Sequence, residues 1–202
     1  MADAGRVHEE PIFFAAAFEA LFDHTLRGRP SPELKGKLRA AGVDLDRPLK
    51  VAYPFKVWED VQAVVAGELY PGVEENEAWF RLGQDFFNGY NATMIGKAAI
   101  AMARLVGIDR LLQRFTSNMR HVNNATEATV ELRERGRILL RMQMVEKFRR
   151  ALPPAPPRLA QYLRGMLLGI MRGLGLADAR VELVQADPSG RNSLYEMTWT
   201  ER

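Results

Sequence analysis

Hydrophobic residues recur at helical spacing through the first two thirds of the chain, most clearly in its middle. Trp79, Leu82, Phe86 and Tyr90 fall on one face of a helix with about 3.6 residues per turn. Several glutamates at 74–77 precede them, where carboxylates complement the positive end of a helix dipole. This stretch therefore predicts a long amphipathic helix with one buried face.

The same spacing predicts further helices before and after this one. They are expected over 18–26, 31–42, 54–70, 109–120 and 158–174. Ser31 precedes Pro32 and is the expected N-cap of its helix. The apolar pattern of the central helix continues to Gly107, either as one long bent helix or as two helices in succession.

Two sets of glycines interrupt these helices, at a cost of about 1 kcal/mol per residue relative to alanine. Gly83, Gly89 and Gly96 predict close packing of the central helix against another helix or a sheet; the alternative is room for a ligand beside Tyr90 and Thr93. The second set, at 165, 169 and 173, forms one stripe. We expect that stripe to lie on a sheet.

Alternating apolar and polar residues, typical of strands, replace the helical spacing after residue 125. Residues 128–133 and 138–144 alternate around a glycine-containing turn, and so predict a β-hairpin with one wet, arginine-rich face. Residues 181–186 and 194–199 predict a second hairpin. The fold class is therefore α+β, with helices packed on a small, mainly antiparallel sheet of about four strands. A short apolar run at 12–17 is a candidate additional strand.

The composition fits one domain that spans residues 1–202, with 47% hydrophobic residues. We expect a flexible N-terminus at 1–10, a helical part at about 18–122, and a hairpin–helix–hairpin part at about 125–200. The chain has no cysteine, which excludes disulfides and thiolate nucleophiles. It shows no signal region and no apolar run of about 20 residues, so a cytoplasmic protein is expected.

Charge is distributed unevenly along the chain. Residues 97–172 hold fifteen Lys and Arg against five Asp and Glu. This excess favours a docking surface for an acidic partner or a phosphate, unless the cations form a solvated face or pair with the acidic N-terminal part. Nucleic-acid binding is not expected, because the arginines are spread over helices and a hairpin without interleaved surface aromatics.

Catalytic and metal-binding signatures do not occur in the sequence. His8, His24 and His121 are isolated from one another and from any clustered ligand. The sequence lacks a nucleophile elbow, a phosphate-binding loop and a dinucleotide fingerprint. We therefore expect neither a metal, nor a cofactor, nor enzymatic activity.

A set of spaced motifs resembles an uncharacterised paralogous family of myxobacteria, a domain of unknown function of about this length. The motifs are Tyr53-Pro54 with Trp58, Leu69-Tyr70-Pro71-Gly72, Arg81-Leu82-Gly83, Phe87-Asn88-Gly89-Tyr90 with Thr93 and Gly96, Arg120-His121-Val122-Asn123-Asn124, and the Gly165/Gly169 helix. The resemblance covers residues 12–199. His121-Val122 and Ala125 depart from it, which puts in doubt any site that this corner forms in relatives.

A more remote resemblance concerns the end of the chain. The order of a glycine-striped helix, a strand, a turn at Gly190 and a second strand is similar to the superfamily of four-vinyl reductases and haem nitric-oxide-binding domains. That resemblance implies a ligand-binding or protein-docking module. None of the histidines is placed where we would expect a haem ligand.

Two functional hypotheses remain. We favour a non-enzymatic signalling or regulatory module that docks an acidic protein partner through a basic face. Its candidate residues are Arg120, His121, Asn123, Asn124, Arg133, Arg135, Arg137 and Arg141. The alternative is a sensor that encloses an apolar small molecule between the central helix and the sheet, with Trp79, Phe86, Phe87, Tyr90, Thr93 and Met94 as the candidate pocket.

Overall fold

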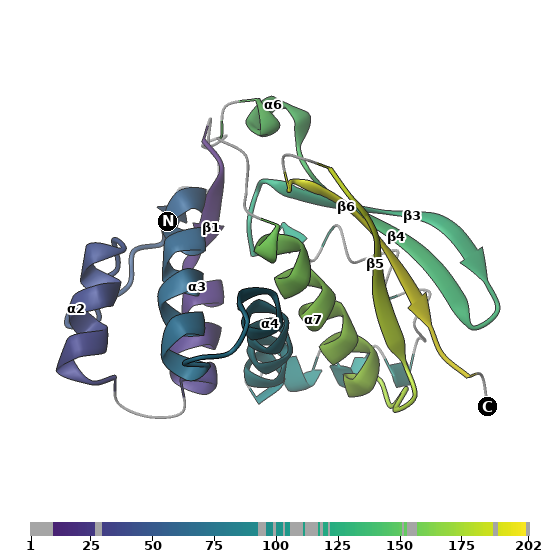
Figure 1. The fold of residues 1–202 in the computed structure, drawn as a ribbon, viewed down its shortest axis with the longest axis horizontal. Helices are drawn as coiled ribbons and strands as arrows, with labels where there is room; N and C mark the ends of the chain where they lie inside the picture. The colour runs from purple at the N-terminus through teal and green to yellow at the C-terminus, as the bar shows by residue number, and fades with distance from the viewer. Residues whose placement is uncertain are drawn as a thin grey trace.

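The fold is known from a computed structural model of the 202-residue chain. The structure describes residues 10–26, 30–92, 96–98, 100–102, 104–105, 111, 117, 119–120, 122–150, 152, 157–187 and 190–200. Within these residues the chain is α+β, as predicted, with helices on one side and an antiparallel sheet on the other (Figure 1).

The N-terminal half is mainly helical. Its elements are β1 (Ile12–Phe14), α1 (Ala15–Glu19), the π-helix η1 (Ala20–Thr25), α2 (Pro32–Ala40), β2 (Ala52–Pro54), α3 (Phe55–Leu69) and α4 (Glu75–Ala92). The predicted cap of α2 is present, because the Leu34 backbone N–H donates to Ser31 Oγ over 3.1 Å.

The N-terminal strand does not extend the main sheet. β1 pairs antiparallel with β2, so that Phe13 lies opposite Tyr53 in a separate two-stranded sheet. On its other side β1 meets residues 122–124, since the Phe14 N–H donates to the Val122 carbonyl over 2.9 Å. The predicted strand over 12–17 ends at Phe14, where α1 begins.

The C-terminal half carries the predicted pair of hairpins. Its elements are β3 (Thr126–Glu134), β4 (Arg137–Met144), the short helix α6 (Glu146–Arg149), α7 (Arg158–Gly173), β5 (Arg180–Ala186) and β6 (Asn192–Thr198). The sheet has the order β3-β4-β6-β5 and is antiparallel throughout. Gly136, at a φ of 70°, makes the tight turn between β3 and β4.

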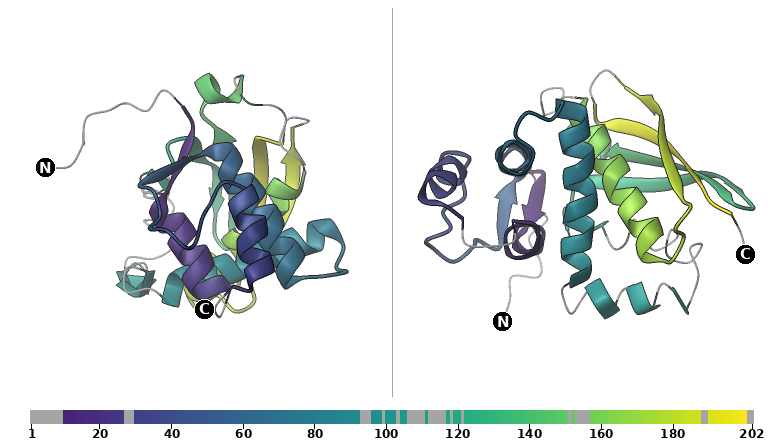
Figure 2. Two further views of the ribbon diagram at one scale, coloured as in Figure 1. Left: turned by 90° about the vertical axis from the view of Figure 1, so that its left-hand side faces the viewer. Right: turned by 60° about the horizontal axis from the view of Figure 1, so that its bottom comes forward.

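α7 lies between α4 and the sheet (Figures 1 and 2). Ile138, Leu140 and Met142 of β4 are buried on the sheet face that α7 covers, together with Leu167 and Met171 of α7. The central helix α4 therefore does not lie on the sheet. The space proposed for a ligand between those two elements is occupied by α7.

The glycines on α4 and α7 explain how closely these two helices approach. A Cβ atom at Gly83 would stand 2.0 Å from the Tyr162 carbonyl oxygen, and one at Gly165 would stand 1.9 Å from the Phe80 carbonyl oxygen. The prediction that the stripe on α7 lies on a sheet was wrong. The stripe faces another helix. Small residues permit close contact with a helix as well as with a sheet, so the glycine spacing alone did not distinguish the two.

Two hydrophobic clusters form the core. The first joins α1, η1, α2, α3 and α4 around Trp58, and the second joins α7 to the sheet around Leu167 and Tyr195. α7 contributes to both, with Leu159 and Tyr162 in the first cluster and its later turns in the second. α4 also contributes to both, with Phe87 in the second cluster, so α4 and α7 connect the two layers of the fold.

Candidate functional site

The aromatic candidates of the ligand hypothesis lie inside the first core cluster. Trp79 and Phe86 are buried, with ring centroids 6.5 Å and 5.8 Å from that of Tyr162. Trp58 meets Phe86 edge-on at 5.7 Å. These distances are typical of packed aromatic pairs, so the rings are in contact with one another.

The remaining ligand candidates lie toward the second cluster or outside the described residues. Phe87 is buried against α7, and a Cβ atom at Gly169 would stand 3.0 Å from Phe87 Cβ. Tyr90 is half-buried, and burial raises the pKa of its hydroxyl above the ordinary value of 10.0. Thr93 and Met94 lie outside the described residues.

A small pocket opens where α3, α7 and the sheet meet. Its cavity volume is about 30 Å³, and its lining includes Phe55, Leu159, Met142, Arg191 and Ser193. Space of this size holds one or two water molecules, whereas sites for drug-sized ligands occupy about 300–1,000 Å³. Sequence analysis did not identify this pocket, since its residues come from distant segments.

A buried ion pair beside this pocket joins the two layers. Arg191 Nη1 lies 3.1 Å from Glu59 Oε1, with only 1% and 12% of the two side chains exposed. Burial raises the pKa of Glu59 above its ordinary value of 4.5, while the charge of Arg191 opposes the shift. Glu59 belongs to α3 and Arg191 precedes β6. We call this pair the interlayer ion pair.

The arginine-rich face predicted for the first hairpin carries its own counter-charges. Arg137 Nε lies 2.5 Å from Glu196 Oε1 of β6, and Arg141 is paired with Glu131 of β3. The hydrogen bond from Arg141 holds the pKa of Glu131 below its ordinary value. These two arginines are therefore matched within the sheet.

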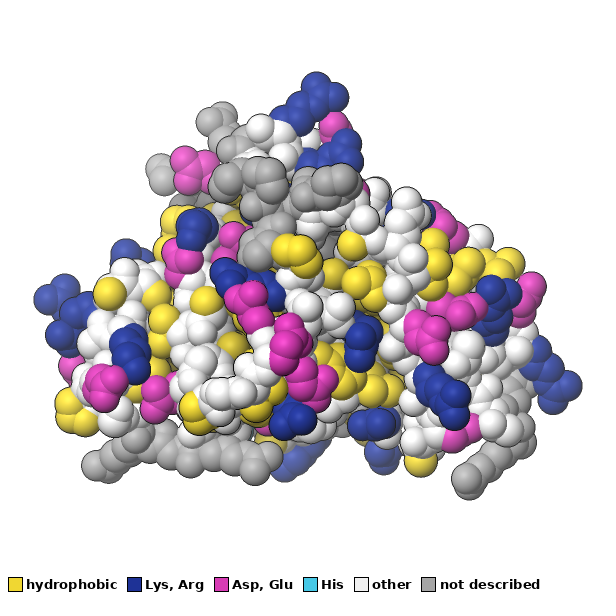
Figure 3. Space-filling view, in the orientation of Figure 1, with side chains coloured by type: hydrophobic (Ala, Val, Ile, Leu, Met, Phe, Trp, Pro, Cys, Tyr) yellow, Lys and Arg dark blue, Asp and Glu magenta, His cyan; other side chains and the backbone are white. Residues whose placement is uncertain are grey.

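The whole outward face of the sheet shares this balance. Its carboxylates are Glu127, Glu131, Glu134, Glu182 and Glu196, and its cations are Arg137, Arg141 and Arg180. Over the part of the molecule where the sheet lies, both signs of charge are interspersed (Figure 3). Among the described residues, this face is not a basic patch.

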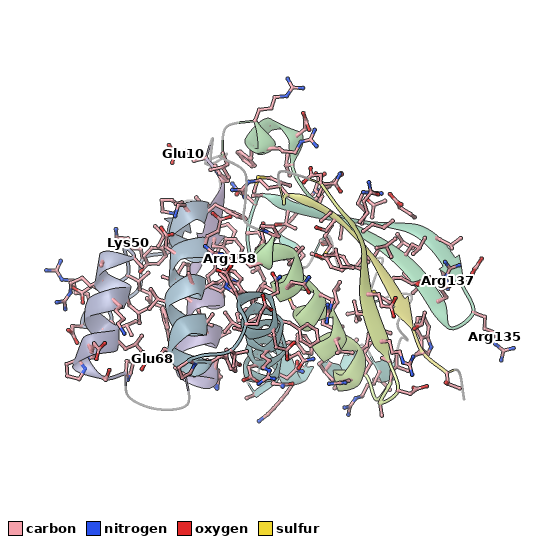
Figure 4. The ribbon with its side chains drawn as sticks, viewed as in Figure 1. Glu10, Lys50, Glu68, Arg135, Arg137 and Arg158 are labelled. Carbon is pink, nitrogen blue, oxygen red and sulfur yellow. The ribbon has the colours of Figure 1, made fainter. Side chains whose placement is uncertain are left out.

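The other partner candidates are placed differently. Arg135 stands at the end of the first hairpin and points away from the body of the molecule (Figure 4). Arg133 lies near that end, opposite Ile138. Arg120 is exposed, and His121 lies outside the described residues.

The two candidate asparagines have structural roles. Asn123 is fully buried, and its Oδ1 accepts hydrogen bonds from the backbone N–H groups of Ala125 and Thr126. Asn124 Oδ1 accepts from the Ile12 N–H over 2.8 Å, and its Nδ2 donates to the Glu10 carbonyl. The pair thus fixes the start of β1 beside the start of β3, and Asn123 presents nothing to a partner.

A helix after α4 presents a surface that the sequence analysis did not single out. Residues 96–98, 100–102 and 104–105 are helical, and we call them the surface helix. Its inner side lies against the end of α7, since a Cβ atom at Gly173 would stand 3.5 Å from Ile100 Cδ1, and the exposed Arg104 at the edge of that side donates from Nη2 to the Gly173 carbonyl over 2.7 Å. Ile100 joins the second core cluster on the same side.

The outer side of the surface helix is apolar. Ala98, Ala101, Met102 and Leu105 are exposed, with 56% of Met102 and 82% of Leu105 open to solvent. Their spacing of three, one and three residues places them on one side of a helix. We call these four residues the apolar stripe. Helical spacing in the sequence shows that a stripe exists but not whether it is covered.

No group of three or more histidine or acidic side chains in the described part of the chain is arranged to hold a metal ion. None of the helices within the described ranges is both long and apolar enough to cross a membrane.

Comparisons with known proteins identify a family and a fold. A family described as "Protein of unknown function (DUF2378)" matches residues 12–200. No curated protein sequence matches the chain.

Solved structures of H-NOX domains share the fold. An H-NOX variant from S. oneidensis in the Fe(II) state has a TM-score of 0.61 at 15% identity, covering 93% of this chain and 96% of that one. An oxygen complex of an H-NOX domain related to soluble guanylate cyclases has a TM-score of 0.58 at 15% identity, covering 93% of each chain. A structure described for haem redox potential and porphyrin distortion has a TM-score of 0.58 at 16% identity, covering 91% and 96%. The remote resemblance to haem nitric-oxide-binding domains is confirmed at the level of fold.

A haem, with which one of these neighbours is described, would find no cysteine and no suitably placed histidine among the described residues of this chain. Haem iron needs an axial ligand such as His, Cys, Met or Tyr. The chain has no cysteine, and His24 is the one histidine within the described part. His24 lies on η1 and packs against α4, since a Cβ atom at Gly89 would stand 2.9 Å from the Cβ of His24. Within the described residues, α4 packs directly against α7, and α7 packs against the sheet.

Proposed function

The chain belongs to the DUF2378 family, whose description gives no activity, and from its geometry we propose a non-enzymatic regulatory module that docks an acidic protein partner. The docking region lies on the described residues of the segment that follows α4, among them Lys97, Arg104 and Arg120, rather than on the outward face of the sheet. The fold of H-NOX domains supplies the scaffold.

The contrast in charge between these two regions carries the proposal. On the sheet face, Arg137 and Arg141 are paired with glutamates of neighbouring strands. Residues 96–120 instead contain five cations, at 97, 104, 110, 114 and 120, against the single acid Asp109. Lys97, Arg104 and Arg120 are exposed. Such an excess steers an acidic partner and weakens with added salt.

A protein capture experiment with charge reversal tests the proposal. The purified chain is immobilised and exposed to lysate of its source cells at low and at high salt. We expect a partner that is retained at low salt, released at high salt, and lost from the Lys97→Glu/Arg120→Glu variant. Arg133→Glu/Arg135→Glu, which reverses as many charges at the hairpin end, is the matched control and keeps the partner. Equal retention by both variants contradicts the proposal.

A sensor of an apolar small molecule is the second candidate, and the fold of the neighbours favours it. One H-NOX neighbour is described as an oxygen complex, and another neighbouring structure is described for its haem redox potential. The packing of Trp79, Phe86 and Phe87 opposes it, because each of these rings already contacts a neighbouring helix of the chain. A ligand there would have to displace core side chains, at a cost of several kcal/mol. We therefore place docking first.

A further inference from the structure

The apolar stripe of the surface helix gives the docking proposal a specific surface. Met102 and Leu105 are two of the four large hydrophobic residues that are conspicuously exposed in the described chain, with Val51 and Val184. Val51 lies in the loop before β2 and Val184 at an irregularity of β5, so each stands apart. Met102 and Leu105 instead lie three residues apart on one helix, and Ala98 and Ala101 continue the same side. A contiguous apolar surface of this kind marks an interaction site more often than scattered exposed residues do.

We propose that this stripe binds an amphipathic helix of a partner protein, with carboxylates along one flank of the partner's apolar side. The inference rests on the proposed docking function and names its surface and the chemistry of its partner. Helix-on-helix docking fits the residues, because the two alanines let a partner backbone approach while Met102 and Leu105 supply the larger contacts. Methionine is common on such surfaces, since its flexible side chain adapts to the partner.

Charge around the stripe fixes the acidic character of the partner. Lys97 and Arg104 are exposed and stand on the same flank of the stripe, seven residues apart, which is about 10 Å along a helix. Arg172 is exposed next to Gly173, whose carbonyl accepts the hydrogen bonds from Arg104. The sequence from 97 to 108 contains no acidic residue. Two carboxylates seven residues apart on a partner helix would therefore meet two cations.

The dimensions of the stripe favour a protein helix over a lipid surface. The stripe spans residues 98–105, about two helical turns, and half of it is alanine. Helices that bind membranes at the interface present larger apolar side chains, typically Trp, Phe and Leu, over a longer face. A partner helix needs only the close approach that alanine permits.

A binding measurement with two designed peptides tests the inference. One labelled peptide of about 20 residues carries leucine and alanine on one side and glutamates at a spacing of seven; its twin carries lysines in place of the glutamates. Fluorescence anisotropy with the full chain should show at least about tenfold tighter binding of the glutamate peptide. The Met102→Asp/Leu105→Asp variant should weaken that binding by about tenfold or more.

Two exposed valines provide matched controls. Val51 is 83% exposed, against 82% for Leu105, and Val184 is 55% exposed, against 56% for Met102. The Val51→Asp/Val184→Asp variant therefore adds the same charges at equally exposed apolar positions. It should keep the affinity for the glutamate peptide within about twofold. An equal loss in both variants would show that added negative charge alone weakens binding, and would overturn the inference.

Further outcomes distinguish a helical partner from a lipid surface or a second copy of the chain. They also distinguish failure of this inference from failure of the proposed function. Binding to vesicles of anionic phospholipid without binding to either peptide overturns the helical partner in favour of a lipid surface. Self-association that Met102→Asp/Leu105→Asp abolishes overturns it in favour of a second copy of the chain. In the capture experiment, loss of the partner from Lys97→Glu/Arg120→Glu but not from Met102→Asp/Leu105→Asp overturns this inference and leaves the proposed function standing. Retention by both variants overturns both.

Discussion

The α4–α7 contact and the surface helix both contain small residues, but the first is a buried contact between two helices and the second is exposed to solvent. In the first, small residues let two helices touch backbone to backbone, as Gly165 does at the Phe80 carbonyl. In the second, Ala98 and Ala101 lie beside large apolar side chains that face water. The first surface is covered by another helix of the chain, whereas the second is open to solvent in the described part of the structure. We therefore propose that the first surface stabilises the fold and that the second binds a partner.

The largest change should come from removing one half of the interlayer ion pair. Arg191→Met leaves Glu59 charged and mostly buried, which typically costs about 3–5 kcal/mol. Urea unfolding followed by circular dichroism measures this loss in the free energy of unfolding. Arg141→Met, which breaks a more exposed pair with Glu131, is the control and should cost no more than about 1 kcal/mol. Similar losses in the two variants would show that the interlayer pair has no special role.

The next largest effect concerns the close contact of α4 and α7. Gly165→Ala places a methyl group against a backbone carbonyl that cannot move alone, so we expect a loss of about 2–3 kcal/mol. Gly67→Ala in α3 is the matched control, because no atom lies within 4 Å of the added Cβ. It should raise the stability by up to about 1 kcal/mol. Thermal unfolding that shifts in the same direction for both variants would contradict the described contact.

A smaller effect should appear in the pH dependence of stability. Because the pKa of Glu59 is raised in the folded state, the folded chain binds more protons than the unfolded chain at pH values between 4.5 and the raised pKa. Stability contributed by this group is present below that window and falls as the pH rises through it. Glu59→Gln should lack this fall, which paired unfolding curves at several pH values would show. A difference between the two proteins that stays constant with pH would refute the raised pKa.

The smallest effect on stability should come from the apolar stripe itself. Leu105→Asp changes an exposed side chain, so the free energy of unfolding should stay within about 0.5 kcal/mol of the parent protein. Leu167→Asp, which puts the same charge into the second core cluster, should unfold the chain. If Leu105→Asp also destabilises the fold strongly, the stripe is a core surface, and its comparison with the α4–α7 contact fails.

Periodicity in the sequence predicted most of the fold. The helices α2, α3, α4 and α7 and the two hairpins were expected from apolar spacing, capping residues and glycine turns. The main errors concern what each element faces. The stripe at 165, 169 and 173 was expected on a sheet but lies on α4. Glycine spacing indicates that another element approaches closely, but it does not show whether that element is a helix or a sheet. β2 has three residues, too few for alternation to be visible.

The candidate sites were harder to predict for the same reason. Arginines at 133–141 indicated a basic hairpin, but Glu196, which neutralises Arg137, comes from a strand more than 50 residues later. Asn123 and Asn124 were candidate partner-binding residues, yet both bond to backbone groups in or beside β1 or β3. The predictions for His121, Thr93 and Met94 concern residues outside those that the structure describes. Pairing between distant segments is not visible in local patterns.

Native mass spectrometry of the gently purified chain, with an absorption spectrum of the same sample, tests most directly whether the layers of this fold pack on each other without a prosthetic group. The direct contacts of α4 with α7, and of α7 with the sheet, predict the mass of the polypeptide and no haem absorption band. A haem or another small molecule that is retained natively and released on denaturation would contradict the account. It would mean that the interior holds a ligand and that the sensor function comes first.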